Sequence, residues 1–282
     1  MILVVESKST RAEWALIDGG EKVHSELTEG INPYIQTRRE ISRSIRLNLS
    51  EEYFKKKYEH IYYYGAGCSA SEKKKIVGAS LVTQFKSRVT VESDLLGVAR
   101  SLFANKFGIA CILGAGSNSC FYNGDTIVKN VKPCGYILGD EGSGTNLGKR
   151  FLADLLKRLA PERLISEFQD RFHLTEDEIM EAVYDHSTSN QFLNSIGEYL
   201  LERRDMDYVK KLLNYNLHSF FDRCLCQYEY SRYPVSFVGS IAFAVQDELR
   251  SMAHEYGIEI KDINETSMEG LISYHMKFYR GN

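Results

Sequence analysis

Residues 2–10 read ILVVESKST, an apolar run that ends in a polar turn of small and hydroxyl side chains. Two further strands are expected over residues 11–17 and 21–26, because the Asp-Gly-Gly between them is a strong turn signal. When the sequence is shifted by 108 positions, Ile2 falls on Ala110 and the same order of strands and turns begins again. The pattern predicts two related domains. Chance similarity between two short hairpins is the alternative.

After each of these starts, strands alternate with helices, which is typical of an α/β layer structure. In the first half, the pattern predicts helices over residues 37–47, 51–58, 71–81 and 94–104, and strands over 61–64 and 89–91. In the second half, a mostly helical stretch over about residues 147–230 precedes strands at 235–238 and 258–263, a helix at 240–256 and a last helix from Met268. The apolar residues of the helical stretch recur at helical spacing and are expected to form a core.

The composition is that of a globular protein and excludes several function classes. Of 282 residues, 43% are hydrophobic and only four are proline, which excludes disorder as the main state. The charge of 35 − 38 = −3 indicates no polyanion-binding surface, so no nucleic-acid partner is expected. No apolar stretch reaches the roughly 18 residues that span a bilayer, so no membrane association is expected either. Glu6 follows too early for a signal peptide, and six cysteines without a C-x-x-C pair indicate reduced thiols in a cytoplasmic protein.

Three turns share a design that suits an anion, since each follows an apolar strand and consists of small or hydroxyl residues with free backbone N–H groups. They are residues 7–10, 114–118 and 239–240. Each turn alone is a common structural feature. Two of them at equivalent points of a repeat are typical of a nucleoside triphosphate held from both sides. The sequence has no G-x-x-x-x-G-K-[ST] motif, which excludes a Walker-type phosphate loop.

Two acidic positions could carry chemistry. Asp94 stands between a strand and a helix, where it is either an N-cap or an ionised carboxylate at the sheet edge that accepts a proton from a hydroxyl. In the segment GDEGSG at residues 139–144, Asp140 could accept hydrogen bonds from two sugar hydroxyls, whereas Glu141 is expected to cap the following helix. Asn32 taken alone is a turn residue. The lysine runs at 55–57 and 73–75 are expected to be solvated helix faces, and Cys224 and Cys226 do not share a face for metal binding.

Along nearly its whole length the chain resembles N-acetylglucosamine kinases of the BadF/BadG/BcrA/BcrD-type ATPase family, in the sugar kinase and actin superfamily. The resemblance is carried by residues 5–13, 31–33, 93–94, 112–120, 135–144 and 239–240, and LGDEGS at 138–143 is its most specific part. It implies two RNase H-like (actin-like ATPase) α/β domains around a central cleft, over residues 1–106 and 107–267. It also implies that the stretch 147–230 is a helical insertion, that the helix at 268–282 packs back on the first domain, and that the protein is a homodimer.

By position, Asp94 matches the catalytic aspartate of the family, the general base that deprotonates the 6-hydroxyl of the sugar for attack on the γ-phosphate. The resemblance also places sugar contacts at Asn32, Asp94, Gly135, Tyr136, Asp140 and Gly144. It places ATP contacts at Ser9, Thr10, Gly114, Ala115, Gly116, Ser117, Asn118, Gly239 and Ser240. Glu6 stands near the position of the metal, which the resemblance implies is Mg²⁺.

The expected function is ATP-dependent phosphorylation of N-acetylglucosamine or a related amino sugar at the 6-hydroxyl. Two residues depart from the family pattern, since Lys8 replaces a glycine in the first phosphate turn and Ala115 replaces a hydroxyl residue in the second. These departures leave a catalytically weak sugar-binding sensor as an alternative. A further alternative is an ATPase that activates an electron-transfer partner, which requires cysteines at a subunit interface.

Overall fold

The computed structural model describes residues 1–8, 11–185 and 188–279. The chain divides into two compact units. The first unit contains residues 1–107, 122–127 and 266–282, and the second contains 108–121 and 128–265. Each unit is built on a five-stranded sheet, and the two are described separately below.

The first sheet has the strand order β3-β2-β1-β4-β5. Its strands are β1 (Ile2–Ser7), β2 (Arg11–Asp18), β3 (Glu21–Glu29), β4 (His60–Gly65) and β5 (Val89–Ser93). The first three strands pair antiparallel, whereas β4 and β5 run parallel to β1. The carboxyl ends of β1, β4 and β5 therefore meet at one edge of the sheet.

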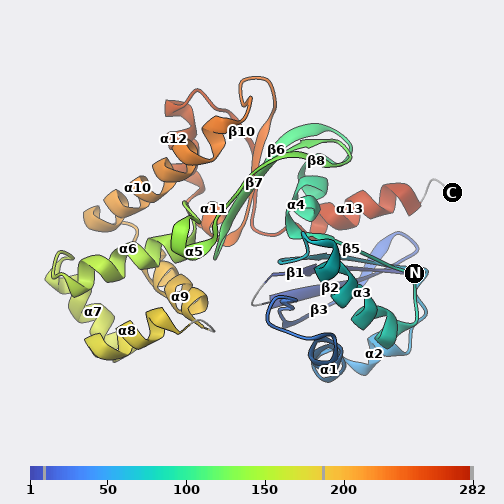
Figure 1. Cartoon of the computed structure of the whole chain (residues 1–282). Coiled ribbons are helices and arrows are strands. Elements are labelled where there is room, and N and C mark those ends of the chain that lie inside the picture. Colours follow the sequence, from blue (N-terminus) through green and yellow to red (C-terminus); the bar gives the residue numbers. More distant parts are fainter. Residues whose placement is uncertain (9–10, 186–187, 280–282) are drawn as a thin grey trace. The chain divides into compact units, whose positions relative to one another are not determined.

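Alternation of side chains along β1 fills two separate cores. Leu3 and Val5 face the helices α1 (Arg38–Asn48) and α3 (Ser71–Phe85), whereas Ile2 and Val4 face α13 (Met268–Tyr279). Helix α4 (Asp94–Phe103) packs beside α13, so α1 and α3 cover one face of the sheet and α4 and α13 the other (Figure 1). A short helix, α2 (Glu51–Phe54), completes the first face. Because both faces are covered, β1 is buried along its whole length and its first four residues are apolar, whereas Glu6 and Ser7 at its end are polar.

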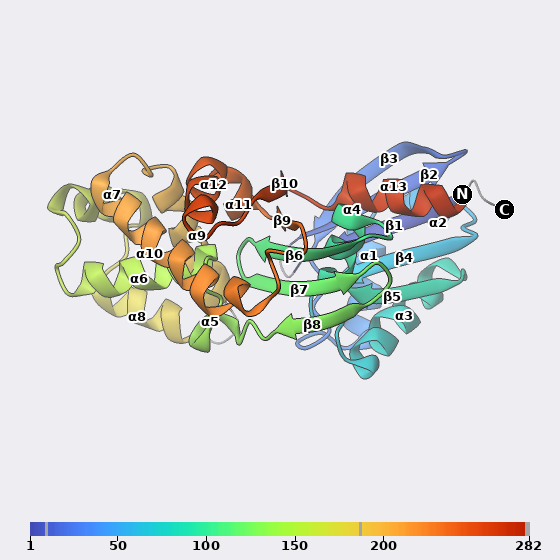
Figure 2. The ribbon, with the colours of Figure 1, turned by 90° about the horizontal axis from the view of Figure 1, so that it is seen from above.

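The second sheet has the order β10-β9-β6-β7-β8 (Figure 2). Its strands are β6 (Phe107–Leu113), β7 (Ser117–Asn123), β8 (Ile127–Val131), β9 (Val235–Val238) and β10 (Ile260–Asn264), and β9 runs parallel to both β6 and β10. The positions of β6 to β10 in this sheet correspond one by one to those of β1 to β5 in the first. The predicted repeat is thus confirmed in the order of the strands.

Helices make up most of the second unit. They are α5 (Gly135–Leu138), α6 (Gly144–Leu156), α7 (Glu162–Phe172), α8 (Glu176–Tyr184), α9 (Ser189–Leu201), α10 (Asp207–Arg223), α11 (Ser240–Ala244) and α12 (Gln246–Glu255), with a short 3₁₀ turn at Leu225–Gln227. The backbones of α6 and α9 approach closely, since a Cβ on Gly148 would lie 2.0 Å from the carbonyl oxygen of Leu193. A side chain at this crossing would therefore force the two helices apart.

Several predicted element boundaries are wrong, although the α/β class is confirmed. The helix predicted over 51–58 ends at Phe54, and the one predicted over 240–256 breaks at Val245. Helix α5 was not predicted, because four residues that begin with a glycine carry no helical periodicity. None of the helices in the described ranges combines the length and apolar character that crossing a bilayer requires.

Candidate active site

In the first unit, the parallel strands end in small residues that stand in a row. The register pairs Ser7 of β1 with Gly65 of β4, and Gly65 with Ser93 of β5. A Cβ on Gly65 would lie 2.4 Å from the Tyr63 ring, so only glycine fits at the centre of this row. Ligands of open α/β sheets bind outside the carboxyl ends of strands. The residues that immediately follow this row are therefore the candidates for chemistry.

Asp94 is the first residue after β5 and begins α4. The interpretation of Asp94 as an N-cap is wrong, because the N-cap is Ser93, whose hydroxyl accepts a hydrogen bond from the Leu96 amide. Asp94 is partly exposed, and its Oδ1 accepts a hydrogen bond from the Leu95 amide at 2.8 Å. Burial raises the pKa of Asp94 above its ordinary value, and the charge of Glu6 raises it further, whereas the Leu95 amide and the ammonium of Lys8 act in the opposite direction.

Glu6 is a buried carboxylate near Asp94 and is the candidate for the metal. Across the described ranges, no three His, Cys, Asp or Glu side chains gather into a group that could hold an ion. Mg²⁺ keeps several waters and is usually held by one or two carboxylates together with the phosphates of a substrate. A single buried carboxylate beside the sheet edge fits a metal of that kind.

Asn32 lies in a turn that Ser7 ties to the end of β1. The hydroxyl of Ser7 accepts a hydrogen bond from the Ile31 amide at 3.0 Å. The side-chain oxygen of Asn32 accepts from the Tyr34 amide at 3.0 Å, as in an Asx turn. This leaves the amide group of Asn32 as the part of its side chain that can donate to a sugar oxygen.

The first predicted phosphate turn is described only in part. Ser9 and Thr10 lie outside the described residues. Lys8 is described, and its amide donates to the carbonyl oxygen of Arg11 at 2.8 Å, which closes the turn between β1 and β2. Lys8 has no positive φ, so the departure from glycine introduces no left-handed backbone at this residue.

In the second unit, the turn of residues 114–118 is bound to Asp140. The amide of Ser117 donates to Oδ1 of Asp140 at 3.3 Å, and a Cβ on Gly116 would lie 3.3 Å from Oδ2. The amide of Gly144 donates to the carbonyl oxygen of Gly114 at 2.9 Å. The turn, the Asp140 carboxylate and the start of α6 therefore form one cluster. The side-chain oxygen of Asn118, at the far end of the turn, is taken by Ser119 and Asn130.

Asp140 is an unusual carboxylate in this cluster. It is 7% exposed and adopts a left-handed backbone with a φ of 54°. Burial raises the pKa of Asp140 to about 6, against the opposing effect of the Ser117 amide. The group consequently changes its charge near neutral pH.

Gly239 and Ser240 join the same cluster at the end of β9. Gly239 has a φ of 136°, and a Cβ there would lie 2.1 Å from the carbonyl oxygen of Leu113 and 3.2 Å from the Gly114 amide. The backbone of this residue thus passes directly against the turn that follows β6. Ser240 begins α11 and is exposed.

The other predicted sugar positions of the second unit precede and follow Asp140 in the sequence. Gly135 and Tyr136 begin α5, and Lys149 donates to the Tyr136 carbonyl oxygen at 2.7 Å. Gly144 begins α6, and a Cβ there would lie 2.4 Å from Oδ1 of Asn194 on α9. Gly144 therefore packs closely against α9, and a side chain there would displace the side chain of Asn194.

The prediction that Glu141 caps a helix is wrong. Ser143 caps α6 by accepting from the Asn146 amide, and Glu141 forms an ion pair with Arg223 at 2.6 Å. Sequence reasoning also missed Asn216, whose buried side chain accepts from the Gly142 amide and donates to the Ser143 carbonyl oxygen, each at 3.0 Å. The sequence signal that could have identified Asn216 was its position as a polar residue on the apolar face of α10.

Comparisons with known proteins place the chain in a family. No protein-family model matches the chain, and no curated protein matches it. Among solved structures, a provisionally named N-acetylglucosamine kinase from Porphyromonas gingivalis is 36% identical with a TM-score of 0.93, over 99% of this chain and 100% of that one.

Two more distant structures share the fold. A second provisionally named N-acetylglucosamine kinase, from Chromobacterium violaceum, is 15% identical with a TM-score of 0.75, over 97% of this chain and 98% of that one. A ROK-family glucokinase from Streptomyces griseus, solved with glucose and AMPPNP, is 12% identical with a TM-score of 0.61, over 97% of each chain. At 36% identity over its full length, the chain belongs to the N-acetylglucosamine kinase-like family of the Porphyromonas gingivalis protein and has the α/β fold of actin-like sugar kinases.

Proposed function

We propose that this protein transfers the γ-phosphate of ATP to the 6-hydroxyl of N-acetylglucosamine or a related amino sugar, with Asp94 as the general base. The observation that carries the proposal is the position of Asp94, a partly exposed carboxylate directly after the row of small residues that ends the parallel strands. Membership of the family supports the reaction class.

Asp94 is built to accept a proton. The Leu95 amide holds Oδ1, so Oδ2 is the oxygen available to a substrate hydroxyl. The N-terminus of α4 favours the ionised carboxylate and so opposes the effect of burial, which raises the pKa of Asp94 on balance. A general base of this kind contributes about 10²–10⁴ to the rate.

The turns of the second unit are the proposed phosphate contacts. A Cβ on Gly114 would meet only the Gly116 carbonyl oxygen, at 4.0 Å, so the space beside this residue is open to a ligand. Ala115 lacks a hydroxyl, but its carbonyl oxygen accepts from both the amide and the hydroxyl of Thr145. Thr145 thus fixes the turn at the residue that departs from the family pattern. Mg²⁺ beside Glu6 would neutralise part of the negative charge of the phosphates.

Asp140 is the proposed acceptor for sugar hydroxyls, and its raised pKa makes sugar binding depend on pH. With a pKa of about 6, the carboxylate is ionised at pH 7 and loses acceptor capacity as it is protonated below pH 6. We expect the Kd for the sugar to rise by up to about tenfold per pH unit below 6. Isothermal titration calorimetry between pH 5 and 8 measures it.

The same pKa predicts the stability of the sugar-free protein. Because the folded state binds the proton more tightly than the unfolded state, the contribution of Asp140 to the free energy of unfolding falls as the pH rises from about 4 to 6. Asp140→Asn should remove the pH dependence of both the sugar Kd and this contribution to the free energy of unfolding. Asp247→Asn, on the exposed surface of α12, should remove neither pH dependence. A sugar affinity that is flat across this range in the unaltered protein would exclude Asp140 as the acceptor.

Lys8 near Asp94 is the observation that favours the sugar sensor as an alternative. The rise in Tm that each ligand causes distinguishes the kinase from this sensor. A ligand that binds only the folded state raises Tm by mass action. We expect N-acetylglucosamine and Mg-AMPPNP each to raise Tm when added alone at about 100 times Kd. A rise with the sugar and none with the nucleotide would favour the sensor and contradict the kinase.

A further inference from the structure

Two neighbouring hollows on the first unit are lined by cations. The first, of about 540 Å³, lies between α1 and α3 and is lined by Arg38, Arg39, Arg43 and Arg46 together with four uncharged residues. The second, of about 670 Å³, shares Arg46 and Gln84 with the first and is also lined by Lys55, Lys56, Lys57 and Lys86. Because they share Arg46 and Gln84, the two hollows adjoin, and together they are called the basic groove below.

No carboxylate is among the residues that line the basic groove. Eight cationic side chains therefore meet in one place on a chain whose net charge is −3. The overall charge, which indicated no polyanion-binding surface, conceals this concentration. A depression lined by one sign of charge attracts ions of the other sign.

Part of this charge has no partner within the protein. Lys55 and Lys56 form ion pairs with acidic residues one turn earlier, Glu51 and Glu52. Among the described residues, no ion pair or hydrogen bond engages the side chains of Arg39, Arg43, Lys57 or Lys86. Arg39 and Arg43 are one turn apart on α1, and Arg46 follows Arg43 by three residues, so their charges repel one another along one face of the helix.

Lys86 contributes a further cation to the groove. It ends α3 with a left-handed backbone, at a φ of 51°. Glycine is the usual residue in this conformation at a helix end, because it carries no steric penalty there. Other helices of this chain also end without glycine, as His173 does after α7, so the backbone of Lys86 is not specific to the groove and its contribution is its charge.

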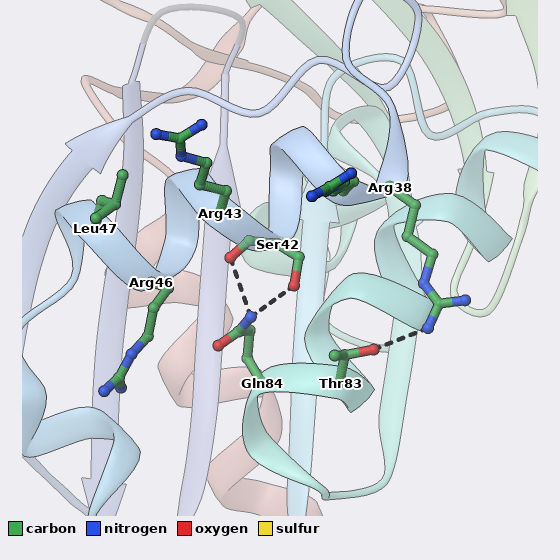
Figure 3. A pocket seen from close by; sticks show the side chains of 8 residues that line it. Arg38, Ser42, Arg43, Arg46, Leu47, Thr83 and Gln84 are labelled. Carbon is green, nitrogen blue, oxygen red and sulfur yellow. Dashed lines mark hydrogen bonds between the residues drawn. The ribbon is translucent and has the colours of Figure 1, made fainter.

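The walls of the basic groove are fixed by contacts between α1 and α3. Gln84 donates to both the carbonyl and the hydroxyl oxygen of Ser42, and Arg38 donates to the Thr83 hydroxyl at 2.9 Å (Figure 3). Arg43 and Arg46 project from the part of α1 that also carries Leu47 (Figure 3). Arg46 lies 4.5 Å from the centre of the Phe54 ring, which stacks on Phe85. The groove therefore has rigid walls and an aromatic floor.

We propose that the basic groove binds a small anion that carries two or more phosphate groups. A planar guanidinium group matches the geometry of a phosphate and can bind two of its oxygens at once through two parallel N–H groups. A concave site between two braced helices admits a small molecule, whereas a bilayer surface is flat and cannot enter it. The groove shares no residue with the proposed ATP and sugar contacts, so this site is additional to the active site.

Calorimetric titration with inorganic tripolyphosphate, in magnesium-free buffer without nucleotide, tests this site, and the groove variants below identify where it binds. We expect one binding event with a Kd below about 1 mM, weaker at higher salt. The double substitution Arg39→Glu with Arg43→Glu should raise Kd at least about tenfold, because two attractive charges become repulsive. Arg39→Gln with Arg43→Gln should have an intermediate effect and serves if the first variant does not fold.

The matched control is Lys75→Glu with Lys106→Glu, which changes the net charge equally at exposed positions outside the groove. Its Kd should change less than about threefold, since exposed charges at a distance are screened. An equal loss in both double variants would overturn the site, and so would no measurable binding at millimolar tripolyphosphate. Groove-dependent binding of phosphatidylserine vesicles or duplex RNA in place of tripolyphosphate would overturn it as well. A protein that binds tripolyphosphate in the groove but does not phosphorylate N-acetylglucosamine with Mg-ATP would contradict the kinase and leave this inference intact.

Discussion

Asp94→Asn should lower kcat for sugar phosphorylation by at least about 10²-fold and leave the Kd of the sugar nearly unchanged. Asparagine has the shape of aspartate, and its side-chain oxygen can keep the bond from the Leu95 amide that holds Oδ1. It cannot take a proton from the sugar hydroxyl at neutral pH. Steady-state kinetics with Mg-ATP give kcat, and calorimetry gives the Kd.

Asp125→Asn is the matched control for this substitution. Asp125 is an exposed turn residue of the same unit, outside the sheet edge, so its kcat should stay within about twofold of the unaltered enzyme. If Asp94→Asn also kept its turnover, Asp94 would have no part in proton transfer. A loss of sugar affinity equal to the loss in kcat would assign Asp94 to binding alone.

Gly239→Ala should lower the free energy of unfolding by about 2–6 kcal/mol. Two costs add at this residue, since a φ of 136° is strained for alanine and the new Cβ would lie 2.1 Å from the Leu113 carbonyl oxygen. The backbone must then move away from the turn at Gly114, so nucleotide affinity should fall together with stability. Urea unfolding followed by circular dichroism measures the first effect, and AMPPNP titration the second.

Gly257→Ala separates the two costs. Gly257 also has a positive φ, of 68°, but a Cβ there would meet nothing within 4 Å. Only the backbone term applies, so its destabilisation should be about 1–2 kcal/mol with nucleotide affinity unchanged. Equal effects at the two glycines would mean that the close approach of Gly239 to the turn contributes nothing.

The strands and their turns were accessible to sequence reasoning because each depends on local signals. Apolar runs that end in small residues predicted β1, β6 and β9, and the repeat along the chain predicted two related domains, whose sheets have corresponding strand orders. The same local logic placed Asp94 at a strand end. From the sequence, Asp140 was assigned to the sugar and the turn at 114–118 to ATP, and the hydrogen bond from the Ser117 amide that joins them was not predicted.

The remaining features depend on contacts between residues far apart in the sequence. Glu141 resembled a helix cap by its position, but Arg223 on α10 takes it as an ion-pair partner. Asn216 forms hydrogen bonds with Gly142 and Ser143, from which it is separated by 74 and 73 positions in the sequence. The basic groove combines side chains of α1 and α3 with those of segments that follow α2 and α3, so the average charge of the chain gave no indication of it.

The central claim is tested most directly by incubating the protein with Mg-ATP and N-acetylglucosamine and following the reaction by ³¹P and ¹H nuclear magnetic resonance. We predict one phosphate ester for each ADP formed, with the phosphorus coupled to the two protons on carbon 6 of the sugar. ADP accompanied by free phosphate and no ester, or an ester at another hydroxyl, would contradict the account.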